Sequence, residues 1–127
     1  MDTLIAHNTC YGSTGPLLQI DADEHRGSVV ANNIFVQEPN RQMTAVMGKT
    51  TGLTFQSNLW CGQQPQPLAR SAADVFDDPE LQDAAGFDPL SFRLRPSSPA
   101  IGATIFKTIV AVDFSGQRRA RESIGAW

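Results

Sequence analysis

The residues best suited to bind a ligand stand at the C-terminal end of the sequence. Arg118, Arg119 and Arg121 could hold an anion such as a uronate or a phosphate, because guanidinium groups form paired hydrogen bonds with both. Trp127 could stack on a sugar ring, whereas Trp60 falls in a predicted core column. Arg118, Arg119 and Trp127 are therefore our candidate ligand-binding residues. The commoner alternative is a solvated terminal strand whose arginines pair with nearby carboxylates.

No combination of residues predicts a catalytic centre. His7 and His25 lie in separate turns, and an isolated histidine is usually a hydrogen-bonded turn residue. Asp113 and Glu122 could form the acid pair of a glycosidase, but nothing in the sequence sets their separation. We expect Asp113 to cap the turn at residues 114–116 instead. We therefore assign no catalytic residue.

The acidic run between residues 74 and 88 has two interpretations. Its carboxylates belong to Asp74, Asp77, Asp78, Glu80, Asp83 and Asp88. Oxygen ligands of this kind suit calcium, but the spacing is not that of an EF-hand and the turn glycine is missing. Two short helical turns explain the run more simply, one opening with a capping box at residues 71–74 and one with Asp78 before Pro79. We favour the helical turns and expect neither a metal nor a cofactor.

The composition limits the chain to one domain and a few classes of partner. It has 127 residues, of which 41% are hydrophobic and 18% charged, and this balance predicts a packed fold. A net charge of −3 argues against nucleic-acid binding. No run could span a bilayer and no secretory signal is visible, so we expect no membrane partner and, by default, a soluble cytoplasmic protein.

A constant step organises the first half of the sequence. It relates three asparagines, Asn8, Asn33 and Asn58. It also relates two apolar columns, Ile5, Val30 and Phe55 in one and Cys10, Phe35 and Trp60 in the other. A second register with the same step matches Leu18 with Met43 and Ile20 with Ala45. A step of about 25 residues is typical of a stacked repeat architecture.

Each unit of the repeat offers three short β-prone runs separated by polar turns. Three turns per unit close a triangular coil, and coils stacked at about 4.8 Å pair each strand in parallel with its copy. Asparagine suits the bend, because it tolerates left-handed backbone and its amide can donate and accept along the column. The prediction is an all-β, single-domain β-solenoid, with about three coils over residues 1–63 and a closing segment over 64–127. The alternative is an immunoglobulin-like sandwich in which the spacing is coincidental.

Residues 30–35 and 56–60 resemble the repeat units of right-handed parallel β-helix proteins, the pectate-lyase-like superfamily. Residues 88–90, 92–102, 113–118 and 124–127 follow the order of a C-terminal region often found at the end of bacterial β-helix proteins. The chain departs from that pattern at Gly102 and Ser123, where acids are common, and at Ser115, which interrupts the usual Asp-Gly turn. The resemblance implies a right-handed parallel β-helix, and the chain reads as the last coils and cap of a longer one.

The resemblance also implies where catalysis would take place, namely on the outward face of the first strand of each coil. The outward rows predicted there are Leu4, Val29 and Thr54, and Ala6, Ala31 and Gln56. A lyase needs a base and usually a cation, and these rows supply no carboxylate, lysine or arginine. The rows need an apolar cover instead, either the segment 99–112 or a second subunit.

Two cysteines remain, and they permit at most one disulfide. Cys10 and Cys61 belong to coils two steps apart, which exceeds ordinary disulfide geometry. No zinc-binding spacing is present. We expect two free, mostly buried thiols that act as small apolar residues.

We conclude from the sequence that the chain is a non-catalytic, truncated β-helix with an interaction or scaffold role. An uncovered first coil presents unpaired N–H and C=O groups, which predicts a homo-oligomer formed through the open edge or the apolar sheet face. The alternative is a carbohydrate-binding module, or a relic of a polysaccharide-active enzyme, that holds a glycan with Arg118, Arg119 and Trp127. A weaker possibility is an enzyme site assembled between subunits.

Overall fold

Short strands in parallel sheets make up the first part of the molecule. The computed structural model describes residues 3–21, 24–84, 86, 88–119 and 122–127. One sheet contains β1 (Leu4–Ala6), β4 (Ser28–Ala31) and β7 (Leu53–Gln56). The next contains β2 (Thr9–Tyr11), β5 (Ile34–Val36), β8 (Leu59–Cys61) and β9 (Val75–Phe76). The last contains β3 (Leu18–Ile20) and β6 (Thr44–Val46).

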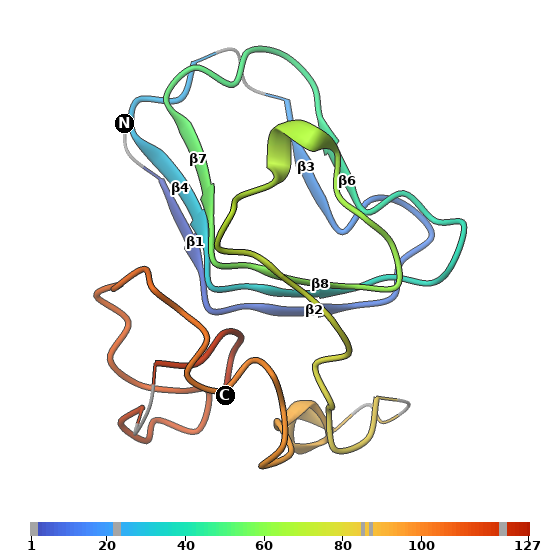
Figure 1. Cartoon of the computed structure of the whole chain (residues 1–127), viewed down its shortest axis with the longest axis vertical. Coiled ribbons are helices and arrows are strands. Elements are labelled where there is room, and N and C mark those ends of the chain that lie inside the picture. Colours follow the sequence, from blue (N-terminus) through green and yellow to red (C-terminus); the bar gives the residue numbers. More distant parts are fainter. Residues whose placement is uncertain (1–2, 22–23, 85, 87, 120–121) are drawn as a thin grey trace.

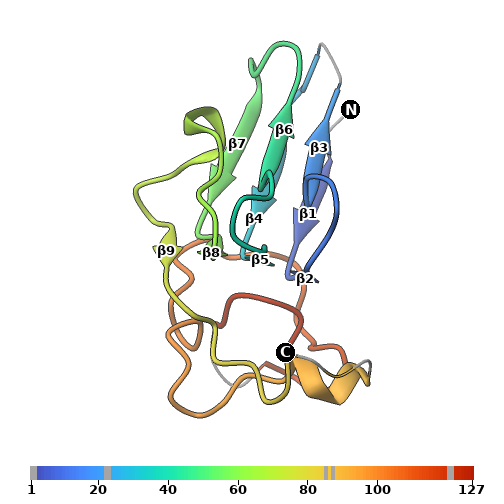
Figure 2. The ribbon, with the colours of Figure 1, turned by 90° about the vertical axis from the view of Figure 1, so that its right-hand side faces the viewer.

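The three sheets surround a common interior, as Figure 1 shows, and successive strands lie side by side in Figure 2. We call β1–β3 the first layer, β4–β6 the second layer, and β7 with β8 the third layer. Helices are few: the described chain has two 3₁₀ helices, η1 (Pro67–Ala69) and η2 (Pro89–Phe92). The prediction of an all-β chain with parallel pairing is confirmed.

The constant step predicted from the sequence holds in two sheets and is wrong in the third. Ile5 pairs with Val30, and Cys10 pairs with Phe35, as that step requires. Leu18, however, pairs with Thr44 rather than with Met43, one residue further along the chain. The turn before β6 covers residues 37–43 and is one residue longer than its counterpart at 12–17, while the turn after β6 is one residue shorter.

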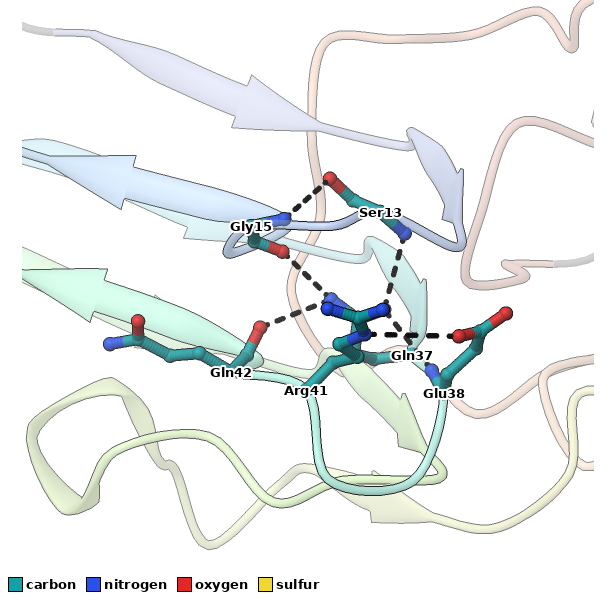
Figure 3. A network of polar contacts seen from close by, with 6 residues as sticks. All are labelled: Ser13, Gly15, Gln37, Glu38, Arg41 and Gln42. Carbon is teal, nitrogen blue, oxygen red and sulfur yellow. Dashed lines mark hydrogen bonds and ion pairs between the residues drawn. The ribbon is translucent and has the colours of Figure 1, made fainter.

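The longer turn is built around the side chain of Gln37, which is buried (Figure 3). Its Nε2 donates to the carbonyl oxygens of Gly15 and Gln42 at 2.9 and 3.1 Å. Its Oε1 accepts from the backbone N–H groups of Ser13 and Glu38 at 3.2 and 3.1 Å. One amide therefore ties the turn of the second layer to that of the first, which accommodates the extra residue.

The interior between the sheets is filled by the apolar columns predicted from the repeat. The rings of Phe35 and Trp60 stack at a centroid distance of 4.6 Å and an interplanar angle of 15°. Val30 and Phe55 are buried beside them. Ala69 of η1 completes this core from the side of the third layer.

The asparagine column forms the predicted hydrogen-bond ladder. The backbone N–H and Nδ2 of Asn8 donate to Oδ1 of Asn33 at 3.0 and 2.9 Å. The same groups of Asn33 donate to Oδ1 of Asn58, both at 3.0 Å. Asn33 and Asn58 are fully buried, so the ladder satisfies amides that would otherwise be costly to bury.

The left-handed backbone lies one residue before each asparagine, which corrects the sequence prediction. His7, Asn32 and Ser57 have φ of 55°, 58° and 54°. The bend is therefore made by the residue before each ladder asparagine. The asparagines themselves follow the bend and lead into the next strand. This leaves their amides aligned with the stack while the preceding residue takes the strained conformation.

Residues 64–76 cover the third layer. Oδ1 of Asp74 accepts from the backbone N–H of Asn58 at 2.9 Å, where the next ladder amide would stand. Its Oδ2 accepts from Nε1 of Trp60, also at 2.9 Å. Oε1 of Gln66 accepts from the N–H of Val46 at 2.7 Å, and β9 pairs with β8. Side chains thus close much of this end.

Of the two turns predicted in the acidic run, one is present. Residues 71–74 make a single turn, in which the N–H of Ser71 donates to Oδ2 of Asp74 as in a capping box. The segment at Asp78 is not helical: Glu80 has φ of 52°, and Leu81 bridges Leu94 in an antiparallel pair. The capped turn is η2, whose first free N–H, at Leu90, donates to Asp88 at 2.8 Å.

The C-terminal part of the chain lies outside the β2–β5–β8 sheet (Figures 1 and 2). Ala100 and Ile124 pack on the outward side chains of Ile34 and Leu59. The cover predicted for the segment 99–112 therefore reaches a different face, and Leu4 stays 42% exposed.

Both cysteines are free thiols, as predicted, although each is only half-buried. Burial raises the pKa of Cys10 and of Cys61. No helix in the described ranges is long and apolar enough to cross a membrane.

Candidate functional site

The structure brings Arg118, Arg119 and Trp127 to the wall of one pocket. Its volume is about 420 Å³, and Arg93 and Asp113 contribute to the same wall. Arg118 lies on an antiparallel bridge with Val112, which turns the chain back at residues 113–117. The sequence prediction thus grouped three residues that the fold does place together. Arg121 lies outside the described residues.

Arg119 is engaged with the main chain. Its Nη1 donates to the main-chain oxygen of Trp127 at 3.1 Å and its Nη2 to that of Ala126 at 3.2 Å. Burial lowers the pKa of Arg119, and the charge of Asp113 opposes that shift. This guanidinium holds the last residues against the turn, so Arg118 is the more available cation of the pair.

The ring of Trp127 already has partners. The guanidinium carbon of Arg93 lies 4.6 Å from the ring centroid, and the ring of Phe114 lies at 5.3 Å. A guanidinium at that distance over an indole is a stabilising cation–π contact. Sequence reasoning missed Arg93, because no spacing relates it to Trp127. The alternation of Phe92, Arg93 and Leu94 was the only signal for its outward position.

Asp113 caps its turn, as predicted. Its Oδ1 accepts from the N–H and the Oγ of Ser115, at 2.9 and 2.7 Å, and from the N–H of Gln117 at 3.0 Å. The Ser115 hydroxyl bond is the largest cause of the lowered pKa of Asp113. Glu122 lies 3.8 Å from Nζ of Lys107. The two acids are therefore engaged separately, each with its own partner.

The carboxylates of the acidic run hold local structure. Asp74 closes the ladder, Asp78 accepts from the N–H of Glu80 at 2.8 Å, and Glu80 accepts from the Ser97 hydroxyl. Asp88 caps η2. Among the residues that the structure describes, no three histidine, cysteine, aspartate or glutamate side chains come together as metal ligands.

His7 occupies the corner where the C-terminal part meets the sheets. Its Nε2 lies 2.8 Å from Oγ1 of Thr108 and 3.3 Å from Nδ2 of Asn32. Burial lowers the pKa of His7 to about 4, and the charge of Arg119 acts in the same direction. His7 is thus a buried, neutral turn residue. His25 is buried in a separate turn.

The segment 104–108 reaches the same corner. Oγ1 of Thr104 donates to Oδ1 of Asn32, and Nδ2 of Asn32 donates to the carbonyl of Phe106 at 2.8 Å. The N–H of Ile105 donates to Oγ of Ser57 at 3.4 Å. The segment leaves Ile105 68% exposed, and Ile109 just after it is 91% exposed.

A second candidate surface is the outer edge of the first layer, which we call the N-terminal edge and define as β1, β2 and β3. Within the described residues these strands pair on one side only. The core residues Ile5 and Cys10 are half-buried, whereas their partners Val30 and Phe35 are each 1% exposed. Tyr11 is exposed there as well. The end of the apolar core is therefore accessible at this edge.

No protein-family model, no curated protein and no solved structure matches the chain. The interpretation of both surfaces therefore depends on their geometry and chemistry.

Proposed function

We propose that the chain is a non-catalytic interaction or scaffold protein, a short right-handed parallel β-helix of about three coils that self-associates through the N-terminal edge. The observation that carries the proposal is the contrast in burial between Ile5 and Cys10 in the first layer and Val30 and Phe35 in the second. Apolar surface of this kind is stabilised by removal from water, and a strand edge adds unpaired backbone groups.

The opposite end supports the proposal by comparison. The third layer has equivalent core residues in Phe55 and Trp60, and both are buried. Its cover comes from residues 64–76, including Ala69 and the carboxylate of Asp74. The two ends of the stack thus differ in what covers them, and the N-terminal edge is the one that a partner would complete.

Sedimentation velocity over a range of concentrations tests self-association. We expect Leu4→Lys to shift the chain towards monomer by at least about tenfold in dissociation constant, since it places a charge at the edge. The matched controls are Phe76→Lys and Leu68→Lys, which replace comparably exposed apolar residues at the opposite end. A wild-type chain that stays monomeric at micromolar concentration, or controls that dissociate equally, contradicts the proposal.

We also propose, as a second candidate function, that the pocket of Arg118, Arg119 and Trp127 binds an acidic glycan. The observation in its favour is that the fold gathers these residues with Arg93 around about 420 Å³. Because Arg119 is bound to the main chain and Arg93 covers the Trp127 ring, the pocket offers charge more than ring stacking.

Calorimetric titration with a short polygalacturonate tests this second function. We expect binding that weakens at least about tenfold in Arg118→Gln, a loss typical of a charged hydrogen bond to a carboxylate. Arg26→Gln, which changes an exposed arginine in a turn of the sheets, should bind like the wild type. Absence of binding to both the acidic and a neutral oligosaccharide would reject the glycan proposal and leave self-association unaffected.

A further inference from the structure

All hydrogen bonds of the asparagine ladder point the same way, from one layer to the next, and this leaves the Oδ1 of the first asparagine as a free acceptor among the described residues. At each step the backbone N–H and Nδ2 of one asparagine donate to Oδ1 of the next, from Asn8 to Asn33 and from Asn33 to Asn58. Asp74 ends the series as an acceptor. Among the described residues, Oδ1 of Asn8 at the other end accepts no hydrogen bond, and Asn8 is exposed.

The N-terminal edge also has backbone N–H and C=O groups without a partner strand among the described residues. The N–H of Val29 donates to the carbonyl of Thr3, and that of Ile34 donates to the carbonyl of Asn8, each at 2.8 Å. In a parallel pair these bonds alternate along the strand, so the N–H and C=O groups of Leu4 and Thr9 point away from the second layer. The edge thus offers a regular row of backbone groups beside the open Asn8 acceptor.

We propose that the N-terminal edge binds an extended protein segment that runs parallel to β1 and β2 and donates an asparagine amide pair to Oδ1 of Asn8. The proposal rests on the proposed function, since it uses the same edge, and it names the chemistry of the partner. The segment needs apolar side chains over Ile5 and Cys10, and a residue that tolerates left-handed backbone directly before its asparagine.

A folded second copy does not present such a segment ready for binding. The donors of its Asn8 and Asn33 are used within its own ladder, and the N–H of its Asn58 is bound to Asp74. The partner that fits is therefore a segment of another protein that is unpaired before binding. Its capture adds strand pairing to an existing sheet edge.

The probe is a synthetic peptide with the sequence of residues 27–38, which contains the strand–bend–strand pattern around Asn33. Its binding to the ¹⁵N-labelled full chain is followed by amide chemical shifts at a concentration where sedimentation has defined the oligomeric state. We expect shifts confined to the first layer, at residues 3–20. A spin label at the peptide N-terminus should broaden Leu4 and spare Tyr11, as parallel pairing requires.

The control is the same peptide with Asn33→Ala, which keeps the apolar pattern and removes the side-chain donor. We expect its affinity to fall about tenfold, because the Nδ2 hydrogen bond to Oδ1 of Asn8 is lost while the backbone N–H can still donate to that oxygen. Equal binding of the two peptides, shifts centred on β7 to β9, broadening of Tyr11 in place of Leu4, or no binding overturns the proposal. Peptide binding by a strictly monomeric chain would uphold it while rejecting self-association.

Discussion

At the scale of single residues, Asp74 connects the ladder to the core. Its carboxylate accepts from the backbone of Asn58, from the indole of Trp60 and from the N–H of Ser71. Trp60 is almost fully buried, so its N–H has no access to water if the carboxylate is removed. A single acid therefore satisfies three donors at the point where the repeat ends.

We expect Asp74→Ala to lower the free energy of unfolding by about 3 kcal/mol, because it leaves buried donors without a partner. Asp74→Asn keeps one oxygen acceptor and should cost less. Urea unfolding followed by tryptophan fluorescence measures both. Asp77→Ala, an exposed acid in the same run, should change stability by under about 0.5 kcal/mol. Equal losses at Asp74 and Asp77 would contradict the role assigned to Asp74.

His7 predicts a pH dependence of stability. Its pKa in the folded chain is about 4 against 6.5 when unperturbed, because burial disfavours the imidazolium beside Arg119. The unfolded chain then binds the proton more tightly, so stability is full above pH 6.5 and falls as the pH drops towards 4. The loss reaches at most about 3 kcal/mol.

The variant His7→Asn isolates that effect, since Asn32 occupies the equivalent left-handed position in the second layer. We expect its unfolding free energy to be flat between pH 6.5 and 4 where the wild type declines. Chemical denaturation at several pH values gives both curves. A variant that keeps the wild-type slope would show that another group titrates in this range.

At the scale of strands and turns, two glycines at equivalent places in the first and third layers differ in how closely the neighbouring layer approaches them. Gly12 and Gly62 both follow a strand of the second sheet and have φ of 55° and 88°. A Cβ on Gly62 would lie 1.9 Å from the carbonyl oxygen of Gln37, whereas one on Gly12 would meet nothing within 4 Å. Their backbone conformations are comparable, but their surroundings differ.

This pair gives a controlled test of the layer contact. Gly12→Ala should cost about 1 kcal/mol, the penalty of left-handed backbone alone. Gly62→Ala should cost at least about 3 kcal/mol, since it also collides with the backbone of the second layer. Thermal and urea unfolding of the two variants measure the difference. Similar losses at both sites would mean that the third layer can shift away from Gln37.

The sequence predicted the parts of the fold that repeat. The columns of Asn33 and Phe35 follow from a fixed step, and the structure pairs them as expected. The position of Arg93 over Trp127 depends on tertiary packing of the C-terminal part, for which no spacing exists. The C-terminal segment packs on Ile34 and leaves Leu4 exposed, and the repeat spacing does not determine which of the two faces is covered.

At the scale of the whole molecule, residues 64–76 cover one end of the stack, whereas at the other end no described strand pairs with the outer side of β1, β2 or β3. In the second layer, β4 and β5 each pair with a strand on both sides. The strand β6 pairs with β3 on one side, and on the other side the N–H of Val46 donates to the side chain of Gln66. Stability against local opening should therefore increase from the N-terminal edge inwards. Fraying at an edge strand needs few contacts to break.

Amide hydrogen exchange tests this gradient. We expect the N–H groups of Leu4 and Thr9 to exchange at least about a hundredfold faster than that of Ile34, which donates across the first and second layers. Exchange measured by NMR on a dilute sample reports the isolated chain. Protection of Thr9 equal to that of Ile34 in a monomeric sample would contradict an open edge, and protection that grows with concentration would support self-association.

The extra residue in the turn at 37–43 affects how the repeat can be detected in a sequence. The step from β3 to β6 is one residue longer than the step from β1 to β4, and the following turn restores the frame so that β4 and β7 keep the shorter step. Two opposite phase slips cancel within one layer. An alignment of the coils that assumes one fixed period would match the strands of the β1–β4–β7 and β2–β5–β8 sheets but would misalign β3 with β6. An alignment that allows each turn its own length would match the strands of all three sheets.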